Sequence, residues 1–307
     1  MIQYNVQRLI VAIAVTAFLA LPVSLHPQSA TSPTPKQSTS PTAQKKTTPT
    51  KKPPVPPLQL EPKALEILKA ASSRLASAHT LSFTAVETFE SLSRQGAPLV
   101  YANRSDVALA RPDKLRVILA GDGPVSEFYD DGKMMMAYAP VENLVAVADA
   151  PPTIDATLEK IYHSAGIYFP FTDLIVADPY GDLAPGLKHA YYVGQSKVVG
   201  GTTTDIVAYM GDGVFVQMWV GTEDHLPREM HAIFLDDPDL LRHNLSLSDW
   251  QIDTPISADA FTSANAAGAR KMQFVNPSPE LSPGARPPAN NAPPKKTKPS
   301  ANPQKSN

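Results

Sequence analysis

The chain has 307 residues, of which 43% are hydrophobic and 32 are proline, so its ordered part is expected to be one domain shorter than the whole. It contains no cysteine, which excludes disulfides, thiolate nucleophiles, thiolate metal ligands and a lipid-modified N-terminal cysteine. Residues 61–276 hold 28 of the 29 acidic residues but only 16 of the 27 basic ones. This acidic centre argues against nucleic acid as the main ligand, because phosphate contacts require a basic face.

Residues 1–30 have the pattern of an export signal. Arg8 precedes an apolar run from Leu9 to Leu25, which is too short for a comfortable membrane span, and cleavage near Ala30 is expected. The alternative is an uncleaved signal that anchors the chain to the inner membrane. Both alternatives place the remaining chain outside the cytoplasm, and we predict a periplasmic location.

Two segments rich in Pro and Lys, 31–60 and 277–307, flank the centre of the chain. Both contain too few apolar residues for burial to offset the entropy of ordering, so we predict that they are disordered. Their basic residues make an anionic membrane surface or another envelope polymer a possible partner. The folded domain is therefore predicted to span 61–276.

The domain is predicted to begin with a helix from Pro62, because apolar residues then recur at helical spacing as far as Ala78. The period of the pattern next changes to two, which is typical of strands with one buried face. The alternating apolar-side residues are Leu81, Phe83 and Ala85, then Val107, Leu109 and Arg111, then Leu115, Val117 and Leu119. Asp131-Gly132 supplies hairpin turn residues, and Met134, Met136 and Tyr138 share one face of the strand that follows. Consecutive strands with short turns predict an antiparallel meander.

A helical segment is predicted to interrupt the sheet at 151–185. Ile154, Leu158, Ile161 and Ala165 recur at helical intervals, and the Pro-broken stretch 168–183 is expected to form a second short helix or an ordered loop. Strands are predicted to resume near Tyr191 and at 203–210, 214–220, 228–235 and 241–252, and Phe261 is expected to begin a last strand or the approach to it.

Motifs that would indicate catalysis are absent from the sequence. It has no GxSxG elbow, no P-loop and no GxGxxG, and no His pair has HExxH spacing. His231 and His243 could meet across strands beside Asp236 or Asp237 as a metal site, but ordinary sheet histidines are the simpler interpretation. The pairs Asp130-Asp131 and Asp236-Asp237 are interpreted as turn residues rather than catalytic acids. We therefore predict no enzyme, no cofactor and no metal.

The segment 111–140, RPDKLRVILAGDGPVSEFYDDGKMMMAYAP, resembles the LolA-like lipoprotein carriers, in which an Arg-Pro pair starts a strand, a DGK hairpin follows and Tyr-x-Pro closes the next strand. The end of the domain, 247–274, is similar to the closing pattern of that family. A nearer resemblance is to an uncharacterised family of predicted periplasmic proteins, a domain of unknown function that shares RPDKLRV, APPTID, ADPY and LSDW. The resemblance covers about 61–275.

The resemblance implies a mainly β (α+β) fold: a curved, open antiparallel half-barrel of about ten to eleven strands, with an N-terminal helix and the insertion 151–185 as a helical lid. In the carriers the Arg of the Arg-Pro pair holds the lid, and the matching residue is Arg111. The alternative for Arg111 is a strand-end side chain that extends to solvent. The predicted ligand-cavity residues are Phe83, Leu109, Leu115, Val117, Met134, Met136 and Tyr138 from the sheet, with Ile154, Leu158 and Ile161 from the lid.

The first functional hypothesis is a non-catalytic periplasmic protein that holds a lipid, a lipoprotein acyl chain or another apolar ligand between sheet and lid. Each methylene moved out of water stabilises such a complex by about 0.8 kcal/mol, without any catalytic group. The alternative is an envelope-associated structural or sensor module that binds a protein partner. A hydrolase is a third possibility, and would require Ser, His and an acid to converge without a motif.

Overall fold

The computed structural model describes residues 59–275, and the strands of this part form one twelve-stranded sheet. Its order is β12-β6-β5-β4-β3-β2-β1-β11-β10-β9-β8-β7, so that β12 and β7 are the two edges and the sheet stays open. All pairs are antiparallel except β12 with β6. The strands are β1 Thr80–Leu92, β2 Pro98–Ala110, β3 Lys114–Gly121, β4 Ser126–Asp131, β5 Met134–Ala139, β6 Leu144–Asp149, β7 Leu187–Ser196, β8 Thr204–Gly211, β9 Val214–Gly221, β10 Pro227–Phe234, β11 Arg242–Ile252 and β12 Arg270–Met272.

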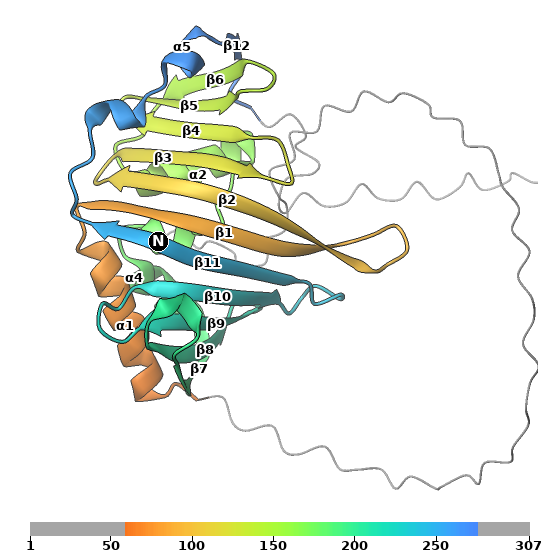
Figure 1. Cartoon of the computed structure of the whole chain (residues 1–307), viewed down its shortest axis with the longest axis vertical. Coiled ribbons are helices and arrows are strands. Elements are labelled where there is room, and N and C mark those ends of the chain that lie inside the picture. Colours follow the sequence, from red (N-terminus) through yellow and green to blue (C-terminus); the bar gives the residue numbers. More distant parts are fainter. Residues whose placement is uncertain (1–58, 276–307) are drawn as a thin grey trace, which may run out of the picture.

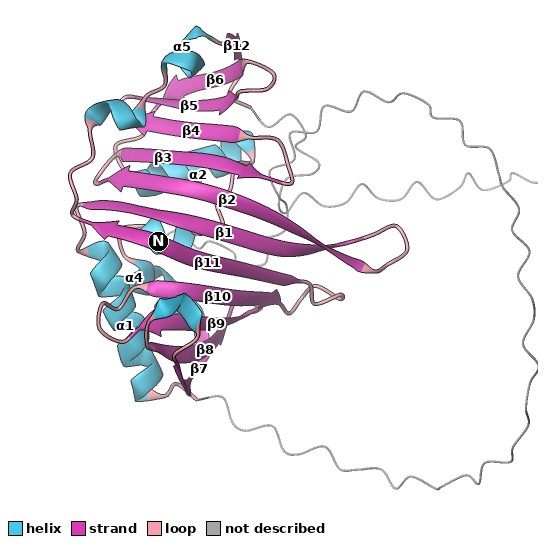
Figure 2. Ribbon diagram, in the orientation of Figure 1, coloured by secondary structure: helices cyan, strands magenta, loops and turns pink. Residues whose placement is uncertain are grey.

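Helices precede the sheet, interrupt it between β6 and β7, and follow β11. They are α1 Pro62–Ala76, α2 Ile154–Ala165, α3 Thr172–Ile175, α4 Pro179–Leu183 and α5 Ala264–Gly268, with short 3₁₀ turns η2 Ala184–Gly186, η3 Val199–Gly201 and η4 Ala258–Phe261. Figure 1 shows α2 behind strands β2 and β3, and α1 along the end of the sheet that contains β7, β8 and β9. The same view coloured by secondary structure shows that β11, from the end of the domain, lies beside β1 from its start (Figure 2).

The first helix is placed by its own residues and by the strand next to it. Pro62 occupies the first turn, where its missing N–H is not needed, and the buried residues Leu68 and Ala71 pack toward β7 and β8. Leu75, near the end of the helix, belongs instead to the core that contains the α2 residues. The segment before the helix adds to the edge of the sheet, since Glu61 N–H donates to the Ala190 carbonyl at 2.8 Å. The apolar stripe predicted for this helix is therefore covered by the last strands of the sheet as far as Ala71, and by the core that contains α2 from Leu75 onward.

The pairing register divides the side chains of the sheet between two faces. Phe83 is opposite Val107, Val107 is opposite Val117, and Val117 is opposite Phe128, so these four side chains share one face. We call this the helix-side face, because the same residues pack with those of α2 in one core. The other, which we call the outer face, carries alternate residues such as Thr84.

The helix-side face is covered in two places. One core lies between strands β1 to β5 and the segment from α2 to Val176, and includes Leu81, Leu109 and Phe171. The other lies between α1 and strands β7 to β10, and includes Leu68 and Val207. Met230 on β10 packs against both cores, so the two are joined across the middle of the sheet.

The predicted architecture is confirmed: an open, mainly antiparallel sheet with an N-terminal helix and a helical insertion. Twelve strands replace the expected ten to eleven, because two strands were not predicted: β6, and the short strand at Arg270–Met272 that runs parallel to it. Of the two alternatives for Phe261, a strand beginning at this residue is wrong, since Phe261 ends the 3₁₀ turn η4 with its side chain buried. It lies instead on the approach to the last strand, β12. The predicted signal (1–30), the linker up to 58 and the tail from 277 lie outside the described residues.

Replacing Phe171 by Ala should lower the free energy of unfolding by about 3–5 kcal/mol, because its fully buried ring packs edge-on to Phe83 at 5.5 Å and parallel to Phe169 at 5.6 Å. Urea denaturation followed by circular dichroism measures the change. Val198→Ala is the control, since Val198 is 88% exposed and should alter stability by less than about 0.5 kcal/mol. Similar small effects of both substitutions would contradict the packing described.

Candidate functional site: a helical lid on the sheet

The segment 151–185, which we call the lid, folds over one half of the helix-side face. Its first helix α2 begins after Thr153, whose hydroxyl accepts a hydrogen bond from Ala156 N–H at 3.2 Å, and ends at Gly166 in the left-handed conformation. The short helices α3 and α4 follow, and Asp178 caps α4 by accepting from Gly181 N–H. The local sequence thus determines where each helix of the lid begins and ends.

Seven of the ten predicted cavity residues come together between sheet and lid. All seven are less than 5% exposed and belong to one core. They are Phe83, Leu109, Leu115 and Val117 from the sheet and Ile154, Leu158 and Ile161 from α2. The apolar stripe of α2 therefore occupies the helix-side face itself, and a ligand could reach these wall residues only if the lid moved.

The prediction that Met134, Met136 and Tyr138 belong to the same wall is wrong. Leu115 is opposite Asp130, and Asp130 is opposite Met135, so Met135 is the residue that shares the face of Leu115. Met135 is fully buried in the lid core, whereas Met134 is 37% exposed. Tyr138 and Met136 pack instead with Ala266 of α5. Three consecutive methionines are all apolar, so the sequence does not show which of them faces the core. The register of the β4–β5 hairpin decides this.

Arg111 joins the sheet to the lid. It follows the last residue of β2, and its Nη2 donates to the carbonyl of Val176 at 3.0 Å. On the same segment of the lid, Ala177 N–H donates to the Asp155 carboxylate at 3.1 and 3.2 Å. The chain at 176–177 is thus held from the sheet through Arg111 and from α2 through Asp155.

The guanidinium of Arg111 is incompletely satisfied in this position. Its Nε–H is buried and has no hydrogen-bond partner among residues 59–275. Burial lowers the pKa of Arg111 from its ordinary value, and the nearby Asp155 carboxylate opposes that shift. A partly buried cation with an unmet donor reduces the stability of the closed arrangement.

Asp130 is a second connection between sheet and lid, which the sequence reasoning missed. The interpretation of Asp130-Asp131 as turn residues holds for both: Asp131 accepts from Lys133 N–H and Met134 N–H at 2.8 Å, and Asp130 accepts from Gly132 N–H at 2.9 Å. Asp130 is fully buried, and its carboxylate accepts from Thr157 Oγ1 of α2 at 2.7 Å. Its strand parity with the inward-facing Phe128 was the signal that could have identified it.

Beyond the lid, the helix-side face carries a row of aromatic rings on four neighbouring strands. Tyr101 stacks on Phe89 at 5.6 Å, Phe89 on His243 at 6.2 Å, and His243 meets Phe234 edge-on at 5.1 Å. Tyr101 is 38% exposed. Burial lowers the pKa of His243, against the raising influence of Asp237 and Glu90. The row lies on the side of the β1–β2 hairpin, and Glu87, which shares the face of Phe89, separates it from the lid core on β1.

The proposed meeting of His231 and His243 is excluded by the register. His231 is opposite Asn244, so His243 on the next position of β11 points to the other face of the sheet. No group of three or more potential metal ligands occurs among the described residues. In the same part of the chain, none of the helices is long and apolar enough to cross a bilayer.

These features define an open antiparallel sheet with an apolar face under a helical lid that is fastened by polar side chains. The chain belongs to the family described as "Predicted periplasmic protein (DUF2092)", whose model matches residues 64–275. This match confirms the resemblance to a family of predicted periplasmic proteins. No curated protein matches the chain by sequence.

Solved structures with a similar arrangement share little sequence with the chain. MucB is 14% identical over 67% of this chain and 64% of its own, with a TM-score of 0.40. LprF from Mycobacterium bovis is 17% identical, covering 64% and 96%, with a TM-score of 0.37. The LolA superfamily protein NE2245 from Nitrosomonas europaea is 12% identical, covering 65% and 97%, with a TM-score of 0.28. The chain thus spans less than two thirds of MucB, and the similarity to all three concerns the fold alone.

Asp130→Asn should change how stability depends on pH. Burial is the main cause that raises the pKa of Asp130 above 3.8, its ordinary value. The folded state therefore favours the protonated carboxyl, and its contribution to stability is complete below about pH 3.8 and is lost as the pH rises through the raised pKa. The free energy of unfolding of the wild type, relative to that of the variant, should fall as the pH is raised from about 4 to 7.

Urea denaturation at a series of pH values measures this difference. Asp131→Asn, one residue further along, controls for the loss of a negative charge at a half-buried turn position. A difference between wild type and Asp130→Asn that stays constant or grows with pH would contradict the account of Asp130.

Proposed function

We propose that the protein is a non-catalytic binding protein that holds the apolar chain of a lipid or lipoprotein between the sheet and the lid. The observation that carries this proposal is the Arg111 contact. An apolar helix-side face is closed by a lid whose loop is fastened to the sheet through one half-buried, incompletely satisfied guanidinium. A fastening of this kind suits a lid that opens and closes.

The energies are consistent with displacement of the lid by a ligand. Each hydrogen bond between lid and sheet contributes about 0.5–1.5 kcal/mol net. An acyl chain of about fifteen methylenes gains roughly 12 kcal/mol on leaving water. The chain would replace the contacts that Leu158 and Ile161 make with the sheet, and would extend toward the ring of Phe89. Residues 154–161 therefore act as a removable apolar cover.

A location of the protein in the cell envelope is consistent with this proposal. A family of predicted periplasmic proteins and the export signal predicted for residues 1–30 both support an envelope location. Lipids and acylated proteins are available there, and the predicted basic segments would bring the domain to an anionic surface. Binding of this type needs no cofactor or metal.

Arg111→Leu should strengthen the apparent affinity for an acyl ligand by roughly two- to tenfold, because loss of one fastening contact raises the population of the open state. Titration with a hexadecanoyl chain that carries an environment-sensitive fluorophore measures the Kd. Arg104→Leu is the matched control, since Arg104 lies on β2 with an exposed side chain paired to Asp106, and its Kd should equal that of the wild type. Absence of saturable binding in both the wild type and Arg111→Leu would exclude the carrier function.

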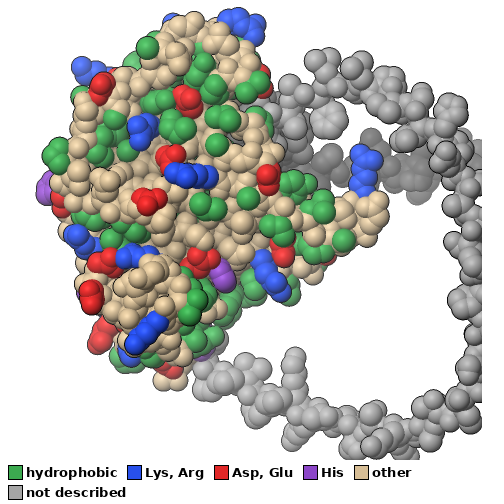
Figure 3. All heavy atoms as spheres, in the orientation of Figure 1, with side chains coloured by type: hydrophobic (Ala, Val, Ile, Leu, Met, Phe, Trp, Pro, Cys, Tyr) green, Lys and Arg blue, Asp and Glu red, His purple; other side chains and the backbone are tan. Residues whose placement is uncertain are grey.

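Binding of a protein partner is the second candidate function, and an exposed apolar surface favours it. Leu92, Leu99, Val100 and Tyr101 are 42%, 46%, 64% and 38% exposed, and all lie on the β1–β2 hairpin. Hydrophobic side chains gather on this projecting hairpin in the space-filling view (Figure 3). By the pairing register, Leu99 and Tyr101 lie on the helix-side face of the hairpin, and Leu92 and Val100 lie on its outer face. Exposed apolar side chains on both faces of a projecting hairpin favour an interaction site there.

A photo-crosslinking amino acid at position 100 distinguishes the two functions in intact cells. If the hairpin binds a protein, Val100 should yield one discrete protein adduct. The same probe at Val198, which is exposed just before the η3 turn, should yield none. The same set of adducts at both positions, or lipid adducts alone at Val100, would contradict partner binding through the hairpin.

A further inference from the structure

The outer face of the sheet contains two neighbouring hollows, on the side opposite the lid. One has a volume of about 300 Å³ and lies over β9, β10 and β11. The other, of about 440 Å³, extends from the same strands toward Val86 of β1 and the η3 turn at Gly200. His231 lines both hollows, so that they form one continuous groove. These volumes fall in the lower part of the range of small-molecule sites, roughly 300–1,000 Å³.

Aromatic rings stand at two positions along this groove. Phe215 and Trp219 lie four residues apart on β9, which places them about 13 Å from each other along the strand. Both are half-buried and face away from the helices. The ring of His231 on the next strand lies 4.9 Å from that of Trp219 at an angle of 59°. The groove therefore offers flat apolar surfaces, and Met210 and Ile233 lie beside Phe215 on the same face.

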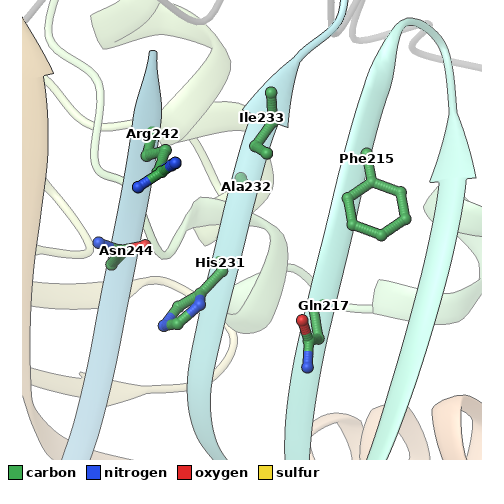
Figure 4. A pocket seen from close by; sticks show the side chains of 7 residues that line it. All are labelled: Phe215, Gln217, His231, Ala232, Ile233, Arg242 and Asn244. Carbon is green, nitrogen blue, oxygen red and sulfur yellow. The ribbon is translucent and has the colours of Figure 1, made fainter. Parts of the chain in front are cut away.

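Polar side chains between and beside the rings present free hydrogen-bonding groups. Figure 4 shows Gln217, His231, Arg242 and Asn244 projecting from three adjacent strands on the side of Phe215. Within the described chain, neither the Gln217 amide nor the Arg242 guanidinium makes a side-chain hydrogen bond. The Asn244 amide donates only a long bond, 3.3 Å, to Thr88 Oγ1. These groups are available to a ligand.

Glu229 fixes the orientation of two of the lining residues. One carboxylate oxygen is 3.1 Å from His231 Nε2, and the other accepts from Ser246 Oγ at 2.6 Å. At the far end of the groove, Arg228 is paired with Asp224 and also donates to the Leu226 carbonyl. Residues of the chain itself therefore largely compensate the charge of Arg228 at this end of the groove. Of the two arginines that line the groove, only Arg242 has no ion-pair partner in the described chain.

We infer that the groove is a binding site for an oligosaccharide of pyranose sugars. A pyranose ring has a flat face of C–H groups, which packs against the face of an aromatic ring, and an edge of hydroxyl groups, which act as donors and acceptors. The rings of Trp219 and Phe215 match the first property, and the amides with Arg242 match the second. Because the groove lies on the face of a sheet, its strand backbones are already paired, so it cannot receive a peptide by strand addition. The site is separate from the lid and does not depend on the proposed carrier function.

The test uses the full chain and an oligomer of four β-1,4-linked N-acetylglucosamine units as the probe. The protein has two tryptophans, and the variant Trp250→Phe leaves Trp219 as the single reporter of the groove. The probe should produce a saturable change in Trp219 emission. Asn244→Ala and Arg242→Ala in the same background should each raise the Kd about tenfold.

The matched control is Arg270→Ala, since Arg270 is exposed and lies on the edge strand β12, far from the strands that line the groove. Its Kd should stay within about twofold of the parent value. Circular dichroism spectra and urea midpoints equal to those of the parent would establish that the groove variants are folded. If one of them does not fold, Gln217→Ala is used in its place. The inference is overturned if the probe gives no saturable change, if the groove variants bind as the parent does, or if a tetraglutamate peptide binds at the same site with equal affinity.

Discussion

An open sheet of this kind has an apolar face that water would otherwise reach, and the chain must cover that face with its own helices. The first half is covered by the lid and the second by α1. Burying aliphatic and aromatic side chains supplies most of the stabilisation. The polar contacts of Arg111 and Asp130 add little net energy, but they determine where the lid closes. A cover that is mainly apolar and fastened at a few polar points is the physical basis of the binding function proposed above.

The fold was largely predictable because the two apolar periods of the sequence are distinct. Helical spacing identified α1 and α2, and alternation identified the wall residues Leu109 and Leu115, since parity within a strand needs only local information. The position of Met135 was not predictable, because all three consecutive methionines are apolar and only the register with β4 selects one. The strand β12 was missed for a similar reason: its three residues are exposed and are ordered by pairing with β6 alone.

The site shows the same division between local and non-local information. Arg111 was identified from local information, a motif and its position on the same strand face as Val107 and Leu109. Its contact with Val176 could not be predicted in this way, because it depends on a loop 65 residues further along the chain. The outer groove had no signal in the sequence, because His231, Arg242 and Gln217 come from three strands and each alone is an ordinary residue of a solvated sheet face. The two faces thus have different chemistry: one is mainly apolar and covered by helices, and the other is open and carries polar and apolar side chains side by side.

Movement of the lid when an acyl ligand binds is the central claim, and a distance across the closed interface tests it most directly. Because the chain has no cysteine, His163→Cys on α2 and Ala120→Cys on β3, both exposed, give a unique pair for spin labels and double electron–electron resonance. With a saturating acyl ligand the distance distribution should shift to longer values by several ångström, and Arg111→Leu should shift part of the population without ligand. One unchanged distribution in all three samples would contradict the account.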